Sequence, residues 1–423
     1  MKSTALIIFV LTYILLLALP KWRYLAAAAM GTATVALGVL PIGKVFGAID
    51  WNVLMMICGT MGIVSLFIES KMPALLADLL INKTPNVRWA ILALSLFAGI
   101  ISAFVDNVAT VLMVAPIALT IAKKLDISPV PAIISISVFS NLQGAATLVG
   151  DTTAILLGGY AGMDFFDFFV CGGRPGMFWI IQISSIVSAL VLYIMFKKET
   201  APVSTGDTTK PTAFFPSALL IAMILLLICA SFIKNKPEIT QGLICIGLMA
   251  LGLVWSVIKK HEFNGVKAVL KDIDYSTLLL LAGLFIVIAG ITEVGIIEDI
   301  SGLFIKFGSG SVFIIYSLLV WGSVLFSAFI DNIPYVATML PVVAGIARGM
   351  GIDPTVLYFG LLSGATLGGN LTPIGASANI TSLGILKKAG YEVKTGEFMK
   401  LSVPFTMAAV ITGYILVWVI FGI

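Results

Sequence analysis

Two stretches of the chain, SAFVDNVATVLMVAPI (102–117) and SAFIDNIPYVATMLPV (327–342), repeat one pattern. Seven of the sixteen aligned positions are identical, where about one or two would match by chance in so apolar a sequence. Forty-four residues beyond each Asp lies a glycine of a second matching pair of blocks, GAATLVGD (144–151) and GNLTPIGA (369–376). The chain is therefore an internal duplication, and each copy carries an Asp-Asn pair inside an apolar run.

Composition places this duplication in a membrane. Of 423 residues, 60% are apolar and only 11% are charged, whereas soluble domains carry about a quarter charged residues. Apolar runs of about twenty residues recur, which is the length that crosses a hydrocarbon core of about 30 Å. We therefore predict an all-α polytopic membrane protein whose main partner is the lipid bilayer. The net charge of +4 mainly reflects orientation in the membrane and does not indicate a nucleic-acid partner.

The residues needed for enzymatic chemistry are scarce. The four cysteines are scattered without CxxC spacing, and the one histidine, His261, lies in the charged stretch KKHEFNGVK. Neither a nucleophile-base pair nor a metal-ligand set is recognisable, so we predict that the protein is not an enzyme and holds no cofactor other than a coupling Na⁺ or H⁺. The first apolar stretch, residues 3–19, is expected to remain as a helix, since no small-residue cleavage pattern follows it.

Charges and Pro/Gly clusters divide the chain into two similar halves joined by a polar linker. A long apolar region in each half has Asp-Asn at its centre, where a charge in lipid would cost several kcal/mol. Two half-helices that meet at the Asp-Asn turn, forming a re-entrant hairpin, explain this better than two full crossings. The predicted units are a first repeat 1–196 (hairpin 89–123, broken helix 130–158), a cytoplasmic linker 197–212, and a second repeat 213–423 (hairpin 311–348, broken helix 355–386).

The distribution of basic residues supports opposite orientations for the two repeats. The predicted topology has about ten transmembrane helices plus two hairpins. Each half contains five crossings, an odd number, so the two halves have opposite orientations in the membrane. With the N- and C-termini outside, eighteen Lys and Arg residues fall inside and seven outside, as the positive-inside rule expects. We expect an integral protein of a prokaryotic cell inner membrane.

Inverted repeats with broken helices are typical of secondary transporters, whose substrate site lies near the midplane. The polar blocks at the breaks are too rich in Gly, Thr, Ser and Asn for lipid-facing helix, and unwound backbone at that depth is tolerated where it lines a cavity. We expect Asp106 and Asp331 to lie close together, and each could instead only cap a half-helix. The candidate substrate- or ion-binding residues are Asp106, Asn107, Asn141, Thr147, Gly150, Asp151, Thr152, Asp331, Asn332, Asn370, Thr372, Gly375, Ser377 and Asn379. A sodium ion would use Asp106, Asn107, Asp331 and Asn332.

These blocks, with ATLVGDTT (146–153) and NLTPIGASANI (370–380), resemble the ion-transporter superfamily, in particular the branch of arsenite permeases, NhaD-type sodium/proton antiporters and the melanosomal P protein. The resemblance covers most of the chain. It implies the fold described above and, by analogy with the citrate and dicarboxylate carriers, a homodimer. Members of the branch often continue Gly-Asp-Pro-Pro-Asn where this chain has Gly-Asp-Thr-Thr-Ala at 150–154, so one ligand amide of that pattern is absent.

The acidic residues guide the functional prediction. Three aspartates and no Lys, Arg or His occur in the site blocks, and unpaired carboxylates would repel a citrate or succinate ion. We predict a secondary-active transporter working by alternating access, with proton- or sodium-linked transport of arsenite or antimonite, or sodium/proton exchange. The alternatives are a sodium-coupled citrate or dicarboxylate carrier and, second, an ion channel, which matched midplane breaks fit less well.

Overall fold

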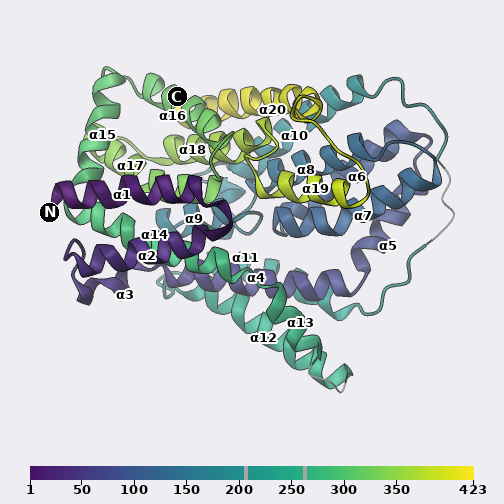
Figure 1. Cartoon of the computed structure of the whole chain (residues 1–423), viewed down its shortest axis with the longest axis horizontal. Coiled ribbons are helices and arrows are strands. Elements are labelled where there is room, and N and C mark those ends of the chain that lie inside the picture. The colour runs from purple at the N-terminus through teal and green to yellow at the C-terminus, as the bar shows by residue number, and fades with distance from the viewer. Residues whose placement is uncertain (204–207, 261–263) are drawn as a thin grey trace.

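The computed structural model describes residues 1–203, 208–260 and 264–423, and these are almost entirely helical (Figure 1). The prediction for His261 and part of the linker, 204–207, lie outside the described residues. The first half contains α1 (Lys2–Ala18), η1 (Pro20–Trp22), α2 (Arg23–Ala36), η2 (Ile42–Lys44), α3 (Val45–Ala48), α4 (Trp51–Glu69), α5 (Met72–Ile81), α6 (Val87–Ser102), α7 (Asn107–Lys124), α8 (Val130–Gly144), α9 (Thr152–Ala161), η3 (Phe165–Phe168), β1 (Val170–Cys171), β2 (Arg174–Pro175) and α10 (Met177–Met195).

The second half repeats this order of helices, and its described residues form no strand hairpin. It contains α11 (Phe215–Ser231), α12 (Thr240–Lys260), α13 (Asn264–Asp272), α14 (Tyr275–Glu293), α15 (Ile296–Phe307), α16 (Val312–Ser327), α17 (Asn332–Met350), α18 (Thr355–Gly368), η4 (Gly369–Leu371), α19 (Ser377–Lys388), α20 (Thr395–Val417) and η5 (Trp418–Gly422). The pair β1 and β2 is a short antiparallel ribbon of two residues each.

Both predicted hairpins are present, as α6 with α7 and α16 with α17. Each second helix begins at an aspartate whose side chain caps it. Asp106 accepts hydrogen bonds from the backbone N–H groups of Val108 and Ala109 at 3.0 and 3.1 Å. Asp331 accepts one from Ile333 at 3.1 Å. An N-cap carboxylate satisfies N–H groups that the first turn of a helix leaves open, so the same residue type sets both turns.

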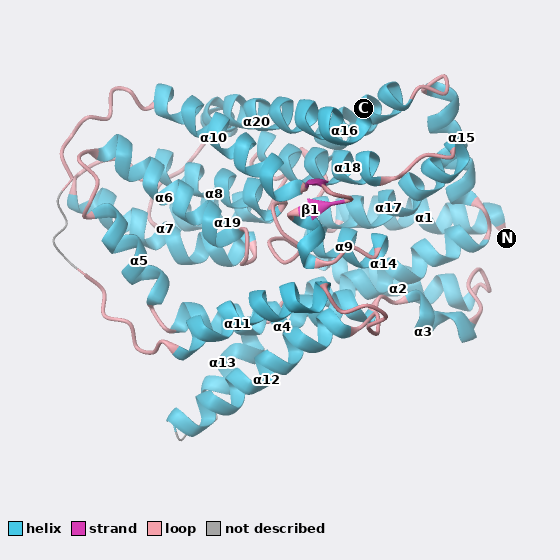
Figure 2. Cartoon of the chain, turned by 180° about the vertical axis from the view of Figure 1, so that it is seen from behind, coloured by secondary structure: helices cyan, strands magenta, loops and turns pink. Residues whose placement is uncertain are grey.

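The two hairpins enter the molecule from opposite ends. Figure 1 shows α6 and α7 at one end of the long axis and α16 and α17 at the other, and Figure 2 shows the same arrangement from behind. The broken helices α8/α9 and α18/α19 run inward and are interrupted in the middle of the molecule. The inverted-repeat architecture predicted from the sequence is therefore confirmed.

Helix contacts outside the hairpins are also matched between the halves. Helix α2 packs on α14 as α12 packs on α4. Both contacts depend on glycine, because a Cβ on Gly283 would lie 2.5 Å from the carbonyl carbon of Ala27 and one on Gly59 would lie 2.4 Å from that of Cys245. Small residues let helix backbones approach closely inside a membrane. These two pairs form a scaffold on which the hairpins and broken helices rest.

Among the described residues, seven helices are long and apolar enough to cross a membrane, and two bent pairs raise this number to nine. The seven include α7 and α17, the second helices of the two hairpins, so five of them (α4, α10, α12, α14 and α20) correspond to predicted crossings. The other five predicted crossings are shorter or interrupted, and α1 and α2 are among them. The crossings α8/α9 and α18/α19 are interrupted by unwound segments, and α11 has only 17 residues.

The turn between α1 and α2 corrects one feature of the sequence analysis. The two helices bend by 114°, and their turn lies near the middle of the long axis (Figure 1). At 1.5 Å per residue they reach only about 26 and 21 Å, short of a crossing of about 30 Å. Lys21 and Arg23, counted above among the eighteen inside residues, therefore lie within the span of the molecule. Without them the bias is still sixteen to seven.

Candidate ion and substrate site

Each hairpin turn is tied to the unwound segment of the broken helix in its own half. The Thr147 hydroxyl donates to the carbonyl of Ala103, and the Thr372 hydroxyl donates to the carbonyl of Ala328. The serine immediately before each of these alanines adds a second matched bond: Ser102 Oγ donates to Ser140 O at 2.8 Å, and Ser327 Oγ donates to Ala365 O at 2.5 Å. Both threonine hydroxyls are thus engaged inside the protein, where they position the unwound segments.

Two glycines allow this close approach. A Cβ on Gly150 would lie 2.7 Å from the carbonyl oxygen of Gly144, and a Cβ on Gly375 would lie 2.6 Å from that of Gly369. Both would also come within 3.0 Å of hairpin carbonyl oxygens. Such contacts leave no room for any other residue, so Gly150 and Gly375 act through their lack of a side chain.

The two halves meet at a buried layer of amides and hydroxyls. Asn141 Nδ2 donates to Thr366 O at 2.7 Å and to Asn370 Oδ1 at 3.2 Å. Asn370 Nδ2 in turn donates to Val138 O at 2.9 Å. Three of the sequence-predicted residues, Asn141, Asn370 and Asn379, therefore lie at the junction of the repeats.

Sequence reasoning missed three partners in this layer. Ser137 Oγ donates to Asn379 Oδ1 at 2.7 Å, and the hydroxyls of Thr153 and Thr366 lie 3.0 Å apart. All three are fully buried or nearly so, at 2% exposure or less. Small polar residues inside the apolar helices α8, α9 and α18 are the signal that could have identified them.

At the first hairpin, Asp106, Asp151 and Thr152 line one small cavity together with residues of α4. Its volume of about 10 Å³ matches roughly one water-sized body. Asp151 is 4% exposed, and Thr153 Oγ1 donates to its Oδ2 at 2.8 Å. Thr60, which sequence reasoning also missed, brings a hydroxyl to the same cavity from α4. Asn107, the residue after Asp106, donates through Nδ2 to Asn141 Oδ1 at 2.9 Å.

At the second hairpin the aspartate has a basic partner. Arg23 Nη1 lies 2.9 Å from Asp331 Oδ2, and Ser377 Oγ lies 3.5 Å from the same oxygen. The position that matches Asp151 is Ala376. Asn332 is 5% exposed, and its Nδ2 has no hydrogen-bond partner among the described residues.

The two aspartates expected to lie side by side therefore have different surroundings. Asp106 caps α7 and faces the cavity it shares with Asp151, whereas Asp331 caps α17 and pairs with Arg23. The first hairpin thus brings one aspartate to another across a small cavity, and the second brings its aspartate to an arginine.

Packing around the two unwound segments also differs. Val149, in the first half, is 3% exposed and lines the small cavity. Ile374, at the matching position of the second half, is 58% exposed. At this position the first segment is therefore covered by α4, while in the second segment Ile374 is exposed although Thr372 and Ala376 beside it are buried.

A larger cavity of about 1570 Å³ extends along the C-terminal part of α9, one turn beyond the small cavity. It lies between α9, α14 and α17 at the end of the molecule that carries α3 (Figure 1). Four of its lining residues are acidic (Asp50, Asp164, Glu238 and Glu293) and two are basic (Lys44 and Lys236). Burial raises the pKa of Asp50 above its ordinary value, against the lowering effect of backbone N–H groups at the start of α4.

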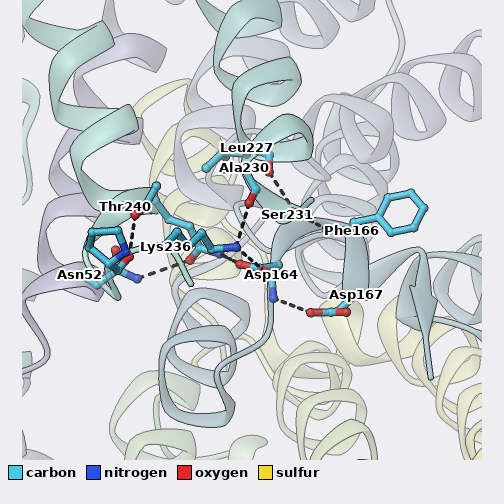
Figure 3. Close-up of polar contacts among 11 residues, drawn as sticks. Asn52, Asp164, Phe166, Asp167, Leu227, Ala230, Ser231, Lys236 and Thr240 are labelled. Carbon is cyan, nitrogen blue, oxygen red and sulfur yellow. Dashed lines mark hydrogen bonds and ion pairs between the residues drawn. The ribbon is translucent and has the colours of Figure 1, made fainter. Parts of the chain in front are cut away.

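An ion-pair network forms one wall of this cavity (Figure 3). Lys236 Nζ donates to Asp164 Oδ2 at 2.5 Å and to Ala230 O at 2.9 Å. Gln241 Nε2 donates to the other Asp164 oxygen at 2.7 Å. The loop after α9 is thereby fastened to the turn between α11 and α12. Acidic residues remain in excess, which favours the approach of cations.

A resident metal site is not evident in the described part of the chain, where no group of three His, Cys, Asp or Glu side chains could hold a metal ion. A cation at the first hairpin would instead be held by Asp106 and Asp151 with hydroxyl and carbonyl oxygens.

Comparison with known proteins agrees with this architecture. Solved structures with the same fold include the YdaH transporter of Alcanivorax borkumensis (TM-score 0.61, 15% identity, 89% of this chain and 87% of that one). MtrF of Neisseria gonorrhoeae, from a class of antimetabolite efflux pumps, matches with a TM-score of 0.56 at 17% identity over 96% of this chain and 86% of its own.

Relatives by sequence are membrane proteins or transporters. A 46 kDa membrane protein of Mycobacterium leprae is 31% identical over 99% of this chain and 98% of its own length. An uncharacterised transporter of Mycobacterium tuberculosis is 30% identical with the same coverage. The human P protein is 26% identical over 87% of this chain and 54% of its own length. The family model described as citrate transporter matches residues 13–364, so the chain is a membrane transporter that belongs to the citrate transporter family.

Proposed function

We propose that the protein is a cation-coupled secondary transporter in which the coupling ion, H⁺ or Na⁺, binds between Asp106 and Asp151. The observation that carries this proposal is the water-sized cavity that both carboxylates line. Two ionised carboxylates facing one cavity of low dielectric repel each other strongly. A bound proton or sodium ion removes that repulsion, so occupancy of the cavity is coupled to the packing of α4 against the first hairpin.

The unequal packing of the two halves supports alternating access. Inverted repeats exchange their conformations when such a transporter turns its site from one side to the other. Here Val149 of the first unwound segment is buried and Ile374 of the second is exposed, a difference that such an exchange would reverse. The remaining basic-residue bias, sixteen to seven, supports an orientation with the linker in the cytoplasm and both termini outside.

The free amide of Asn332 supports an oxygen-bearing substrate. A buried donor without a partner costs about 1–3 kcal/mol, which a substrate oxygen accepting from Nδ2 would recover. This favours a neutral oxyacid such as arsenite or antimonite over simple sodium/proton exchange. A second candidate is citrate, which the description of the family favours, although Asp106 and Asp151, for which the described residues supply no basic partner in the cavity they share, oppose a trivalent anion.

Purified protein in proteoliposomes tests this function. Uptake of arsenite, sodium, citrate and chloride is compared under an imposed pH gradient and an imposed sodium gradient. We expect one solute to accumulate with one of these gradients and to show counterflow, which a channel does not. Absence of gradient-driven accumulation for every solute, or flux without counterflow, would contradict the proposal.

A further inference from the structure

We infer that Arg23 is a built-in cation that fills, in the second half, the place taken by the coupling ion in the first half, so that one cation is bound in each transport cycle. This inference rests on the proposed function and adds the number of coupling ions to it.

The argument starts from the matched backbones of the two hairpin turns. Asp106 has φ −45° and ψ 139°, and Asp331 has φ −53° and ψ 132°. Both residues cap the following helix through one carboxylate oxygen. In each turn one carboxylate oxygen is thus used by the cap and the second is left for another partner.

The groups near these second oxygens carry different charges in the two halves. Asp331 Oδ2 accepts from the Arg23 guanidinium at 2.9 Å. For Asp106 Oδ1, the described residues supply no hydrogen bond and no ion pair, and Asp151 shares its cavity. The formal charge is thus zero at the second turn and −2 at the first, because Ala376 stands where the first half has Asp151.

The guanidinium is delivered by the first pair of helices in the chain. Arg23 is the first residue of α2, and its Nε donates to Leu16 O at 3.3 Å across the α1–α2 turn. That turn is anchored to α17, since the Tyr13 hydroxyl donates to Pro334 O at 2.8 Å. The Arg23 side chain is 25% exposed and the Asp331 side chain 12%, so the pair is mostly shielded from water.

A guanidinium differs from a bound ion in two respects that matter for transport. It stays charged at every physiological pH, and it cannot dissociate from the chain. The second half therefore keeps its positive charge throughout the cycle, and only the cavity at Asp106 and Asp151 gains and loses a cation.

The test compares Arg23→Gln with Arg23→Lys and with the double variant Arg23→Gln/Asp331→Asn. For the wild type and Arg23→Lys, we expect cation dependence of uptake with a Hill coefficient of about one. In Arg23→Gln the unmasked Asp331 should take up a second cation, so the coefficient rises toward about two and more cations move per substrate. The double variant should return to about one, because no charge is left to neutralise.

A second readout does not depend on transport. The Tm of each detergent-solubilised variant is measured with sodium and with choline as the cation. Arg23→Gln should gain a sodium-dependent rise in Tm that Arg23→Lys and the double variant do not gain. If folded Arg23→Gln shows neither the higher ion number nor the sodium-dependent Tm, the inference is overturned and Arg23 only holds the hairpin in place. If the wild type shows no cation dependence of uptake while Arg23→Gln still gains the Tm response, the proposed function fails instead.

Discussion

The two hairpin turns began as copies of one segment and now carry different electrostatics. The first joins two aspartates at a water-sized cavity. The second joins one aspartate to an arginine, near an unwound segment in which Ile374 is exposed. Because the two turns share their backbone geometry, the difference between them lies in a few charged side chains. The duplicated backbone places these side chains, and their charges give the two turns different roles. The first turn suits a mobile cation, and the second suits a fixed charge with a free donor for the substrate.

The largest expected effect is the loss of gradient-driven uptake when an aspartate of the first hairpin cavity is replaced. Asp106→Asn and Asp151→Asn should each lower gradient-driven uptake by about 10- to 100-fold, because each removes a charged ligand worth about 1.5–3 kcal/mol. Exchange of substrate without a gradient should be partly retained. Glu392→Gln, at an exposed loop position, is the control. Gradient-driven uptake at the wild-type level in both variants would show that the coupling ion does not bind in this cavity.

The glycines that hold the two unwound segments should respond alike. Gly150→Ala and Gly375→Ala each place a Cβ within 2.7 Å of a carbonyl oxygen, and overpacking of this kind costs about 1–3 kcal/mol. The Tm of each purified variant should fall by a similar amount. Gly302→Ala on α15, where a Cβ meets nothing within 4 Å, is the control. A large fall in Tm for only one of the two variants would show that the two unwound segments are not packed alike.

Cysteine labelling can sharpen the contrast between the closed and the open segment. In a background whose four native cysteines are replaced by serine, Ile374→Cys should react with a hydrophilic maleimide about tenfold faster than Val149→Cys, since accessibility to water limits this reaction. The imposed cation gradient should reduce this ratio as the halves exchange conformations. Equal rates at rest would mean that Ile374 faces lipid.

The smallest effect concerns the paired asparagines. Asn107→Ala loses a buried bond of 2.9 Å to Asn141, so we expect a loss of stability of about 1 kcal/mol. Asn332→Ala removes an amide whose Nδ2 has no partner among the described residues, so its Tm should stay near that of the wild type while KM for the substrate rises. Equal losses of stability would show that Asn332 is a structural residue.

Much of the architecture could be predicted because local sequence patterns determine it. The two hairpins, the two breaks and the inversion follow from apolar length, from Asp-Asn at the centre of long runs and from the charge count. The glycines at 150 and 375 were found by their matched spacing, although spacing alone could not show that they serve to admit backbone contacts. Thr147 and Thr372 were expected to touch substrate or ion, and the structure places their hydroxyls on hairpin carbonyls.

The sequence by itself determined that the protein is a duplicated, inverted helical bundle with polar breaks at its centre, because hydropathy and repetition are one-dimensional properties. Only the tertiary structure decided which charges meet. Arg23 reaches Asp331 across 308 positions of sequence, and Ser137 reaches Asn379 across 242. The first pairing depends on α1 and α2 being too short to cross the membrane and folding back at mid-depth against α17, and the second depends on the packing of α8 against α19. No pattern within either segment records that packing, so the division of the two turns into a mobile and a fixed cation site became visible only in three dimensions.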